Sequence, residues 1–363
     1  MPEAFDRASE ILLHGILDRA FPAAVAEAGR ADGPLWRRAF GTLTYDPESP
    51  EVTHDTIFDL ASLTKVIATT TLVMRAVDDA LLTVDERVAS RFPEWRGADR
   101  ASVTVRDLLA HASGLPAYLP FFRNYTGRVD FEPAICHTPL EYPPRSQSIY
   151  SDLGFMLLGF LLEDVGRRSS GEGRFDPSSA LASQFRRIAS FITIEPLAFN
   201  PPRTWRARTA PTERDEWRGR LLTGEVHDEN AWALGGAAGH AGLFGTAGAV
   251  GAFAQSALRT IAGERVLAEP STFREFIRRT DIPGSSRALG WDTMLPTSSC
   301  GSRMSATAIG HTGFTGTSLW IDWERDIYVV LLTNRVHPTR ENHRLRAIRP
   351  AFHDAVMEEF DRG

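Results

Sequence analysis

The spacing of apolar side chains along the chain predicts mainly helices. From Leu63 to about Ala80, apolar residues recur every three or four positions, which predicts a buried helix with Ser62 at its first turn. The same spacing predicts an amphipathic first helix within residues 1–30, and further helices over residues 103–109, 153–165, 247–261 and 341–360. Pro350 is expected to interrupt the last of these helices, because proline lacks a backbone N–H.

Patterns typical of strands are found towards the two ends of the chain. Residues 35–45, broken by Gly41, predict paired strands at the edge of a sheet. Residues 317–322 and 327–334 are rich in β-forming side chains and are joined by four residues, which predicts a hairpin. The triplet His311-Thr312-Gly313 precedes this hairpin and is expected to lie on a strand.

The middle of the chain alternates helical patches with Pro and Gly loops. Residues 166–179 are rich in Ser, Gly and Arg and are expected to be mobile. We therefore expect an α/β (α+β) fold, in which residues 1–85 and 290–363 form an antiparallel sheet flanked by helices. Residues 86–289 are expected to form an inserted, mostly helical lobe, with the active site between the two lobes.

Composition limits the classes of function. With 363 residues, 43% of them hydrophobic, the chain can bury a large core, and its net charge of −6 without a basic run gives nucleic-acid binding little support. No apolar stretch approaches the length of a membrane span, and acidic residues near the N-terminus argue against a signal peptide. A cytoplasmic protein is expected, with a trimmed secreted form as the alternative. Cys136 and Cys300 match no metal-ligand or disulfide pattern, and no metal or cofactor is expected.

Lys65 is the only lysine in a chain that otherwise uses arginine as its basic residue. Arginine stays protonated in proteins, whereas a lysine can lose its proton when it is desolvated, so only lysine can accept a proton. Ser62 lies three residues earlier, and residues at this spacing share one face of a helix. The pair favours a serine nucleophile with a basic partner. The alternatives are a helix-capping serine and a solvated lysine.

Three motifs occur in order along the chain: Ser62-Leu63-Thr64-Lys65, Tyr150-Ser151-Asp152 and His311-Thr312-Gly313. With this set the chain resembles the serine β-lactamase and penicillin-binding protein superfamily, and within it the class C β-lactamase-like branch of esterases and D-amino-acid peptidases. The resemblance covers about residues 35–335. The segments 111–116, 150–159 and 242–244 also look like parts of this branch.

The resemblance implies a set of site residues. Ser62, Lys65, Tyr150 and His311 would be catalytic, and Phe314, Thr312, Gly313 and Asp152 would bind the substrate or its oxyanion. The backbone N–H groups of Ser62 and Phe314 would form the oxyanion hole. Lys65 and His311 would supply the positive charge that stabilises a Tyr150 phenolate, so that Lys65 acts as a cation and proton relay. A tyrosine held only by packing is the alternative for Tyr150.

Two of these residues depart from the pattern of the family. Asp152 stands where many relatives carry asparagine, and a carboxylate there would keep Lys65 protonated. It could instead cap the following helix. His311 replaces the lysine of the K-T-G triplet, so recognition of a substrate carboxylate is expected to be weaker and dependent on pH. Thr312 and Gly313 would let a substrate backbone lie along the strand edge.

Other enzyme classes find little support in the sequence. There is no G-x-S-x-G motif of an α/β-hydrolase, the lone lysine does not follow glycine as in a P-loop, and the glycines of 236–245 do not follow a clear strand. The cluster at 227–230 with His240 lacks zinc-site spacing and is expected to give polar support to the glycine-rich loop.

We therefore expect a serine hydrolase that forms an acyl-enzyme on β-lactam, D-alanyl peptide or ester substrates, with small-molecule or peptidyl partners. One alternative is an esterase of the same fold that acts on small esters. Another is a non-catalytic protein that binds cell-wall fragments, which the retention of Lys65 disfavours because arginine could serve binding.

Overall fold

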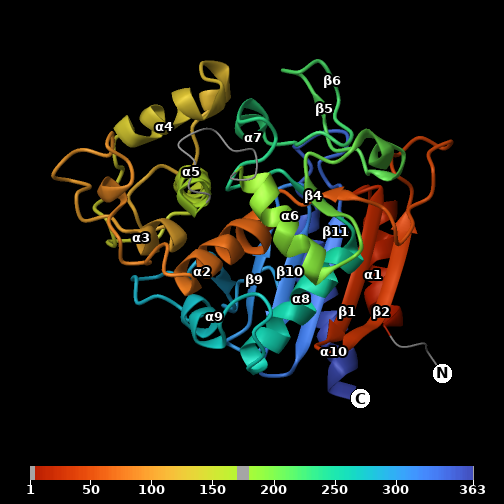
Figure 1. The fold of residues 1–363 in the computed structure, drawn as a ribbon. Coiled ribbons are helices and arrows are strands. Elements are labelled where there is room, and N and C mark those ends of the chain that lie inside the picture. Colours follow the sequence, from red (N-terminus) through yellow and green to blue (C-terminus); the bar gives the residue numbers. More distant parts are fainter. Residues whose placement is uncertain (1–4, 170–179, 363) are drawn as a thin grey trace.

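The computed structural model describes residues 5–169 and 180–362, and an antiparallel sheet of six strands forms its centre (Figure 1). The strands lie in the order β2-β1-β11-β10-β9-β8. Their bounds are β1 (Ala23–Arg30), β2 (Gly33–Gly41), β8 (Asp292–Thr293), β9 (Ile309–Thr312), β10 (Ser318–Asp322) and β11 (Ile327–Thr333). The predicted hairpin is confirmed by β10 and β11, which pair antiparallel with Ser318 opposite Leu331.

Helices cover both faces of this sheet. Helices α1 (Asp6–Leu17) and α10 (Leu345–Arg362) pack together on one face, and α8 (Ala247–Ala262) lies across the other (Figure 1). Successive side chains of β11 point to opposite faces, so Val329 and Leu331 join the core under α1 and α10, whereas Val330 and Leu332 join the core under α8. A strand buried on both faces is apolar along its whole length.

Residues 23–30 form the strand β1, although the sequence predicted a helix within residues 1–30. Over residues 5–30, only α1 is helical, and it ends at Leu17. Alanine is a strong helix former, and this segment contains four alanines and a single β-branched residue, so its local preference does not indicate a strand. Tertiary packing decides, since Ala24, Ala26 and Ala28 are fully buried in the core beneath α1 and α10.

Most other helices lie between β2 and β8 in the sequence. They are α2 (Thr71–Asp78), α3 (Val105–Leu109), α4 (Gly127–His137), α5 (Asp152–Ser169), α6 (Leu181–Ile192), α7 (Glu229–Ala233) and α9 (Pro270–Phe276), with short 3₁₀ turns at η2 (Val88–Ser90), η3 (Phe121–Arg123) and η5 (Arg203–Arg208). Two small antiparallel sheets join them: β3 (Phe58–Asp59), β7 (Leu243–Gly245) and β4 (Leu197–Phe199), and then β5 (Arg214–Asp215) with β6 (Arg220–Leu221).

Three predicted elements differ in detail from the structure. The helix expected from Leu63 begins as a π-helical turn, η1 (Lys65–Thr70), before α2. Pro350 lies inside α10 without interrupting it, because a proline in an early turn removes one backbone hydrogen bond and leaves later turns intact. The predicted mobile segment 166–179 falls partly in α5, and its residues 170–179 lie outside the described residues.

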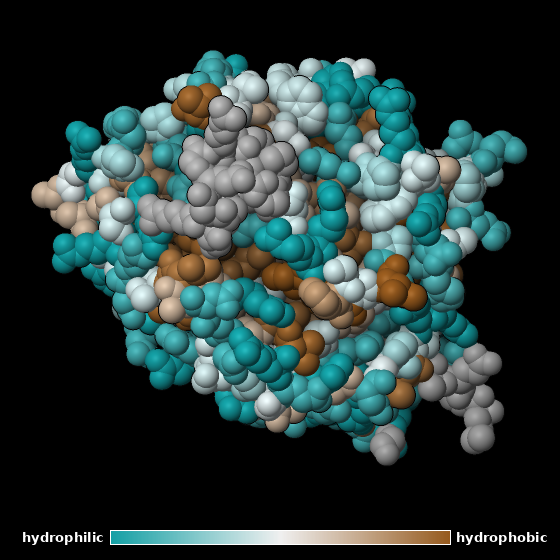
Figure 2. All heavy atoms as spheres, viewed as in Figure 1, coloured by the Kyte–Doolittle hydropathy of each residue, from teal (hydrophilic) through white to brown (hydrophobic). Residues whose placement is uncertain are grey.

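The expected division into lobes places α8 with the inserted helices. In the structure α8 packs against β1, β10 and β11, so this helix belongs with the sheet (Figure 1). The rest of the division at residues 86 and 289 stays a prediction. The face of the molecule in Figure 2 is mostly hydrophilic, with hydrophobic residues gathered around the middle of the view. Over residues 5–169 and 180–362, no helix is both long and apolar enough to cross a membrane.

Candidate active site

Ser62 lies in a tight turn between β3 and η1. The turn begins at Ala61, whose φ of 47° is left-handed, a conformation that costs a non-glycine residue about 1–3 kcal/mol. The buried Asp59 holds this conformation, because its carboxylate accepts a hydrogen bond from the Ala61 N–H at 2.8 Å. A backbone bond from Lys65 N to Ser62 O (3.0 Å) closes the turn and leads directly into the π-helical turn.

Four of the predicted site residues meet around the Ser62 hydroxyl. Tyr150 Oη lies 2.7 Å from Ser62 Oγ, and Lys65 Nζ lies 3.1 Å from the same oxygen. Lys65 Nζ also donates to Asp152 Oδ1 at 2.7 Å and to the carbonyl oxygen of His240 at 3.0 Å. The lone lysine therefore has its three donors directed at a hydroxyl, a carboxylate and a carbonyl.

The carbonyl of His240 reaches Lys65 because the glycine-rich loop packs directly on α5. A Cβ at Gly239 would lie 2.0 Å from the carbonyl oxygen of Phe155 and 2.9 Å from the backbone nitrogen of Gly159. Only two glycines allow this close approach. The loop between α7 and β7 is thereby fixed next to the serine.

Lys65 is fully buried, yet it remains a cation. Burial alone would lower its pKa, but the charges of Asp152 and Tyr150 and their hydrogen bonds outweigh burial and raise the pKa above the ordinary value. The contacts of Lys65 are therefore those of a residue that supplies positive charge to the site. They do not favour Lys65 as the direct base.

Tyr150 differs from the sequence expectation. Burial raises the pKa of its phenol, and the opposing effect of Lys65 does not cancel that rise. The phenol is therefore protonated in the free protein, although we expected cations to stabilise a phenolate. Two rings frame it, with centroids of His111 and His311 at 4.7 and 5.8 Å, and Arg287 lies over its face at 5.3 Å.

His311 lies beside Tyr150 as predicted, but its hydrogen-bonding role is reversed. Its Nδ1 lies 2.9 Å from the carbonyl oxygen of Thr312, so this nitrogen carries the proton and Nε2 is left as an acceptor. Burial, followed by the charges of Arg287 and Lys65, lowers the pKa of His311 well below its ordinary value. A neutral imidazole cannot give the pH-dependent carboxylate recognition that the sequence suggested.

The strand β9 leaves room for a substrate along its edge. Its residues Ile309 and Gly310 pair with β8, but beyond Gly310 only β10 pairs with β9. His311 and Thr312 therefore carry the open edge towards Ser62, and Gly313 follows them. The backbone N–H groups of Ser62 and Phe314 make no hydrogen bond within the described residues, so they are free to donate.

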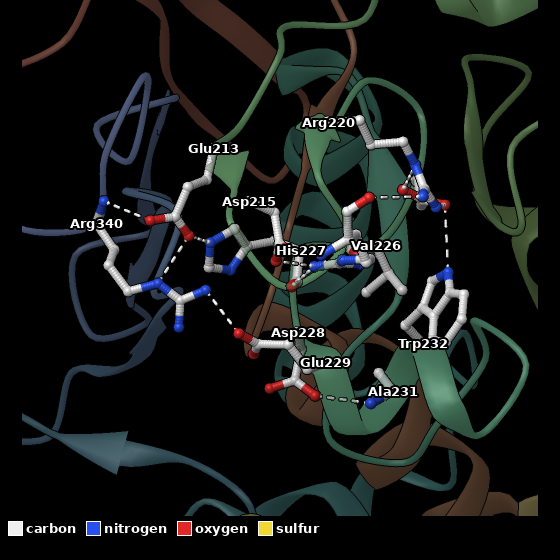
Figure 3. A network of polar contacts seen from close by, with 12 residues as sticks. Glu213, Asp215, Arg220, Val226, His227, Asp228, Glu229, Ala231, Trp232 and Arg340 are labelled. Atoms are coloured by element: carbon white, nitrogen blue, oxygen red, sulfur yellow. Dashed lines mark hydrogen bonds and ion pairs between the residues drawn. The ribbon is translucent and has the colours of Figure 1, made fainter. Parts of the chain in front are cut away.

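A network of ion pairs forms another wall of the site (Figure 3). Arg340 donates to Glu213 at 2.7 Å and to Glu229 at 2.7 Å, and Glu213 also contacts Nε2 of His227 at 2.8 Å. Although burial opposes it, these partners lower the pKa of Glu213 to about 2. The ring of His227 stacks on Phe314 with centroids 5.6 Å apart, so the network supports the residue after the K-T-G-like triplet.

The same region contains the cluster that resembles a metal site. His240 Nε2 contacts Asp228 Oδ1 at 2.9 Å, and Asp228 also caps α7 through the N–H of Ala231. In the part of the chain that the structure describes, no three His, Cys, Asp or Glu side chains are placed to hold a metal ion. The cluster is engaged in ion pairs and a helix cap, and the absence of a metal stays a prediction.

Two cavities of similar size meet at Ser62. The first, of about 310 Å³, is lined by Tyr150, the end of β9 with the residues that follow it (311–314), and the arginines 287, 335, 346 and 349. The second, of about 330 Å³, is lined by Asp152, Tyr118, His227, Asp228, Glu229 and Arg340. Thr312, Gly313 and Phe314 thus lie where the sequence placed them, next to the serine, and Phe314 is 50% exposed.

Sequence reasoning missed several residues of this site. His111 was noted only as part of a turn, yet its Nδ1 accepts the Ser151 N–H at 3.0 Å and its ring packs on Tyr150. The segment 111–116, which looks like part of the family, was the available signal. Arg287 and Arg335 gave no signal, because the chain is rich in arginine and neither belongs to a motif.

The arrangement matches a known family. A profile of the Beta-lactamase family matches residues 7–351. The Escherichia coli (strain K12) protein named "Putative D-alanyl-D-alanine carboxypeptidase" is 31% identical over 341 residues, 84% of this chain and 76% of the relative. Unliganded simvastatin synthase (LovD) from Aspergillus terreus has a TM-score of 0.75 at 20% identity, covering 100% of both chains. EstCE1, described as a hydrolase with promiscuous acyltransferase activity, has a TM-score of 0.72 at 20% identity, covering 97% of both chains.

The two solved structures share the fold of this chain, and the family profile spans nearly all of it. The predicted resemblance and the predicted fold class, helices around an antiparallel sheet, are confirmed. The chain belongs to the Beta-lactamase family and is a serine hydrolase.

Proposed function

We propose that Ser62 is the nucleophile of an acyl-enzyme reaction, with Tyr150 as its proton acceptor and Lys65 as the fixed cation of the site. One observation carries the proposal: the Ser62 hydroxyl lies within hydrogen-bond distance of both the phenol (2.7 Å) and the ammonium (3.1 Å). A nucleophile with two groups in such contact is a triad-like arrangement.

The reaction requires that the Lys65 and Tyr150 pair first lose one proton, since both are protonated in the free protein. Tyr150 then takes the Ser62 proton while Oγ bonds to the substrate carbonyl carbon, and the N–H groups of Ser62 and Phe314 bind the carbonyl oxygen. The phenol returns the proton to the leaving group. A water molecule then attacks the acyl carbon while the phenolate takes its proton, and the phenol passes that proton to Ser62 Oγ as the acyl–oxygen bond breaks.

Substrates that end in a carboxylate are the first candidates, above all D-alanyl peptides. Arg287, Arg335, Arg346 and Arg349 line the cavity beside Ser62 and provide the positive charge that the neutral His311 lacks. The name of the Escherichia coli relative supports the same class. Small esters are the second candidate. The neutral His311 favours them, because its imidazole supplies no positive charge to a substrate carboxylate.

Turnover of two substrates tests this proposal. A peptide ending in D-alanyl-D-alanine and p-nitrophenyl acetate are compared at equal concentration with native protein and with Ser62→Ala. We expect both activities to fall by at least about 10³-fold in Ser62→Ala, consistent with loss of a nucleophile. Residual activity within tenfold of native would contradict the role of Ser62. Release of D-alanine by native protein would favour the peptidase, and ester turnover alone would favour the esterase.

A further inference from the structure

The arginine-lined cavity beside Ser62 has an unusual balance of charge. Arg287, Arg335, Arg346 and Arg349 line it, whereas Asp292 is the single acidic residue among the described residues of its lining. The closest approach of Asp292 to Arg287 is 3.8 Å, a loose contact. The protein as a whole carries a net charge of −6, so this concentration of positive charge is local.

Two of these arginines occupy an unfavourable position. Arg346 and Arg349 lie in the first turns of α10, where the positive end of the helix dipole repels cations, and that first turn contains no acidic residue. The side chain of Arg346 is exposed and has no hydrogen bond or ion pair within the described residues. An arginine without a partner at a helix N-terminus contributes little to the fold.

Arg349 lacks a full set of partners although part of it is buried. Its Nε is buried and makes no hydrogen bond within the described residues, and one Nη reaches the carbonyl of Thr317 only at 3.4 Å. Burial, with the charge of Arg335 adding to it, lowers the pKa of Arg349 to about 10. Arg335 in turn donates to the carbonyl oxygens of Arg340 and Asn342 and not to a carboxylate.

These groups therefore repel one another in the free protein, and a bound anion would relieve that repulsion. A single carboxylate can accept one bidentate pair of hydrogen bonds from an arginine and would leave the other guanidinium groups unpaired. Four guanidinium groups around about 310 Å³ are better matched by two negative charges. His311 also lines this cavity, but its acceptor nitrogen Nε2 is buried and is not presented to the anion.

We propose that this cavity selects substrates whose bound portion carries two negative charges, as a phosphate monoester or as a pair of carboxylates. The proposal rests on the proposed function, because it concerns the group that a substrate of Ser62 places in this cavity. It narrows that function from substrates with one terminal carboxylate to doubly charged ones.

Inhibition of p-nitrophenyl acetate hydrolysis tests it, since this ester is neutral and small. Inorganic phosphate, succinate and acetate are compared at pH 8 and constant ionic strength, so that screening is equal. We expect phosphate or succinate to inhibit at a concentration at least about tenfold lower than acetate. A preference for phosphate identifies a phosphate monoester, and a preference for succinate identifies two carboxylates. Equal inhibition by all three anions would overturn the proposal.

Two variants test whether the anions inhibit by binding in this cavity. Arg346→Gln removes a charge from the cavity lining, and because its side chain is exposed the fold should tolerate the change. Arg344→Gln is the matched control, since Arg344 is also exposed and lies two residues away but lines a different cavity. We expect Arg346→Gln to raise the inhibition constant of the preferred dianion about tenfold and Arg344→Gln to change it less than twofold. Equal effects of the two substitutions would mean that the anions are attracted by positive charge in general and not by this cavity, and would overturn the proposal.

Calorimetry of phosphate and succinate binding to native protein separates the two proposals. Calorimetry measures the affinity of the cavity for each anion in the absence of substrate turnover. Tight dianion binding without any ester hydrolysis would contradict only the acyl-enzyme role of Ser62. Ester hydrolysis without preferential dianion binding would contradict only the inference about the cavity.

Discussion

The contact between Lys65 and Asp152 makes the sharpest prediction about how the site is tuned. Lys65 is fully buried and Asp152 is 18% exposed on its side chain, with 2.7 Å between Nζ and Oδ1. An opposite charge this close moves a pKa by about 1–3 units. The carboxylate raises the pKa of Lys65 and also that of Tyr150, so it opposes the loss of the proton that the pair must give up.

Asp152→Asn removes this charge and keeps an oxygen that can accept from Lys65. We expect the pH at which kcat/KM rises to fall by about 1–3 units, because the Lys65 and Tyr150 pair then loses its proton more easily. The ion pair also stabilises the fold, because without Asp152 the fully buried ammonium would lose its charged partner. The folded pKa of Lys65 is raised, so this stabilisation is present at neutral pH and disappears as the pH rises through that folded pKa. The variant should accordingly unfold more easily at pH 7.

The assay is a pH profile of p-nitrophenyl acetate hydrolysis from pH 5 to 10, with denaturant unfolding at pH 7. Asp281→Asn is the control, because it makes the same chemical change at an exposed position outside both cavities. A profile of Asp152→Asn that stays within about 0.3 units of native, or that moves to higher pH, would refute the reasoning.

Three further changes test other contacts. Tyr150→Phe removes the oxygen that lies 2.7 Å from the serine and should lower kcat about 10²–10⁴-fold with an unchanged circular dichroism spectrum; normal kcat would exclude the phenol as base. His311→Gln should keep the shape of the native pH profile between pH 5.5 and 7.5, because burial and the nearby cations lower the pKa of His311 well below its ordinary value. Loss of a titration step in this range would show that the imidazole does titrate. Gly239→Ala places a Cβ 2.0 Å from a carbonyl oxygen of α5 and should cost about 1–3 kcal/mol of stability, measured by denaturant unfolding. Gly154→Ala is the control and should cost far less, because the atoms nearest to its Cβ lie at 3.6 Å. Equal costs would show that the loop does not pack tightly on α5 at Gly239.

The sequence predicted the reactive side chains of the site better than the charges and hydrogen bonds that surround them. Ser62, Lys65 and Tyr150 could be found because they belong to motifs with fixed spacing, and the structure brings their polar atoms together. The role of His311 could not be predicted, since its tautomer depends on the carbonyl of Thr312 and on burial. The charge of Arg287 likewise reaches the site only through folding.

The fold likewise contains elements that the sequence predicts and elements that it does not. The hairpin β10 and β11 and the long helices α5 and α8 follow from strong periodic patterns that span many residues. Strand β1 does not, because its alanines fit a helix as well as they fit the narrow space beneath α1 and α10. Local preference is weak for such residues, and packing against elements distant in sequence decides.

Covalent trapping tests whether Ser62 is the nucleophile. Native protein and Ser62→Ala are incubated with a fluorophosphonate and, separately, with a penicillin, and their intact masses are measured. We expect a single fluorophosphonate adduct on native protein, located at Ser62 by peptide mapping, and none on Ser62→Ala. No adduct on native protein with either reagent, or an adduct that persists in Ser62→Ala, would contradict that role.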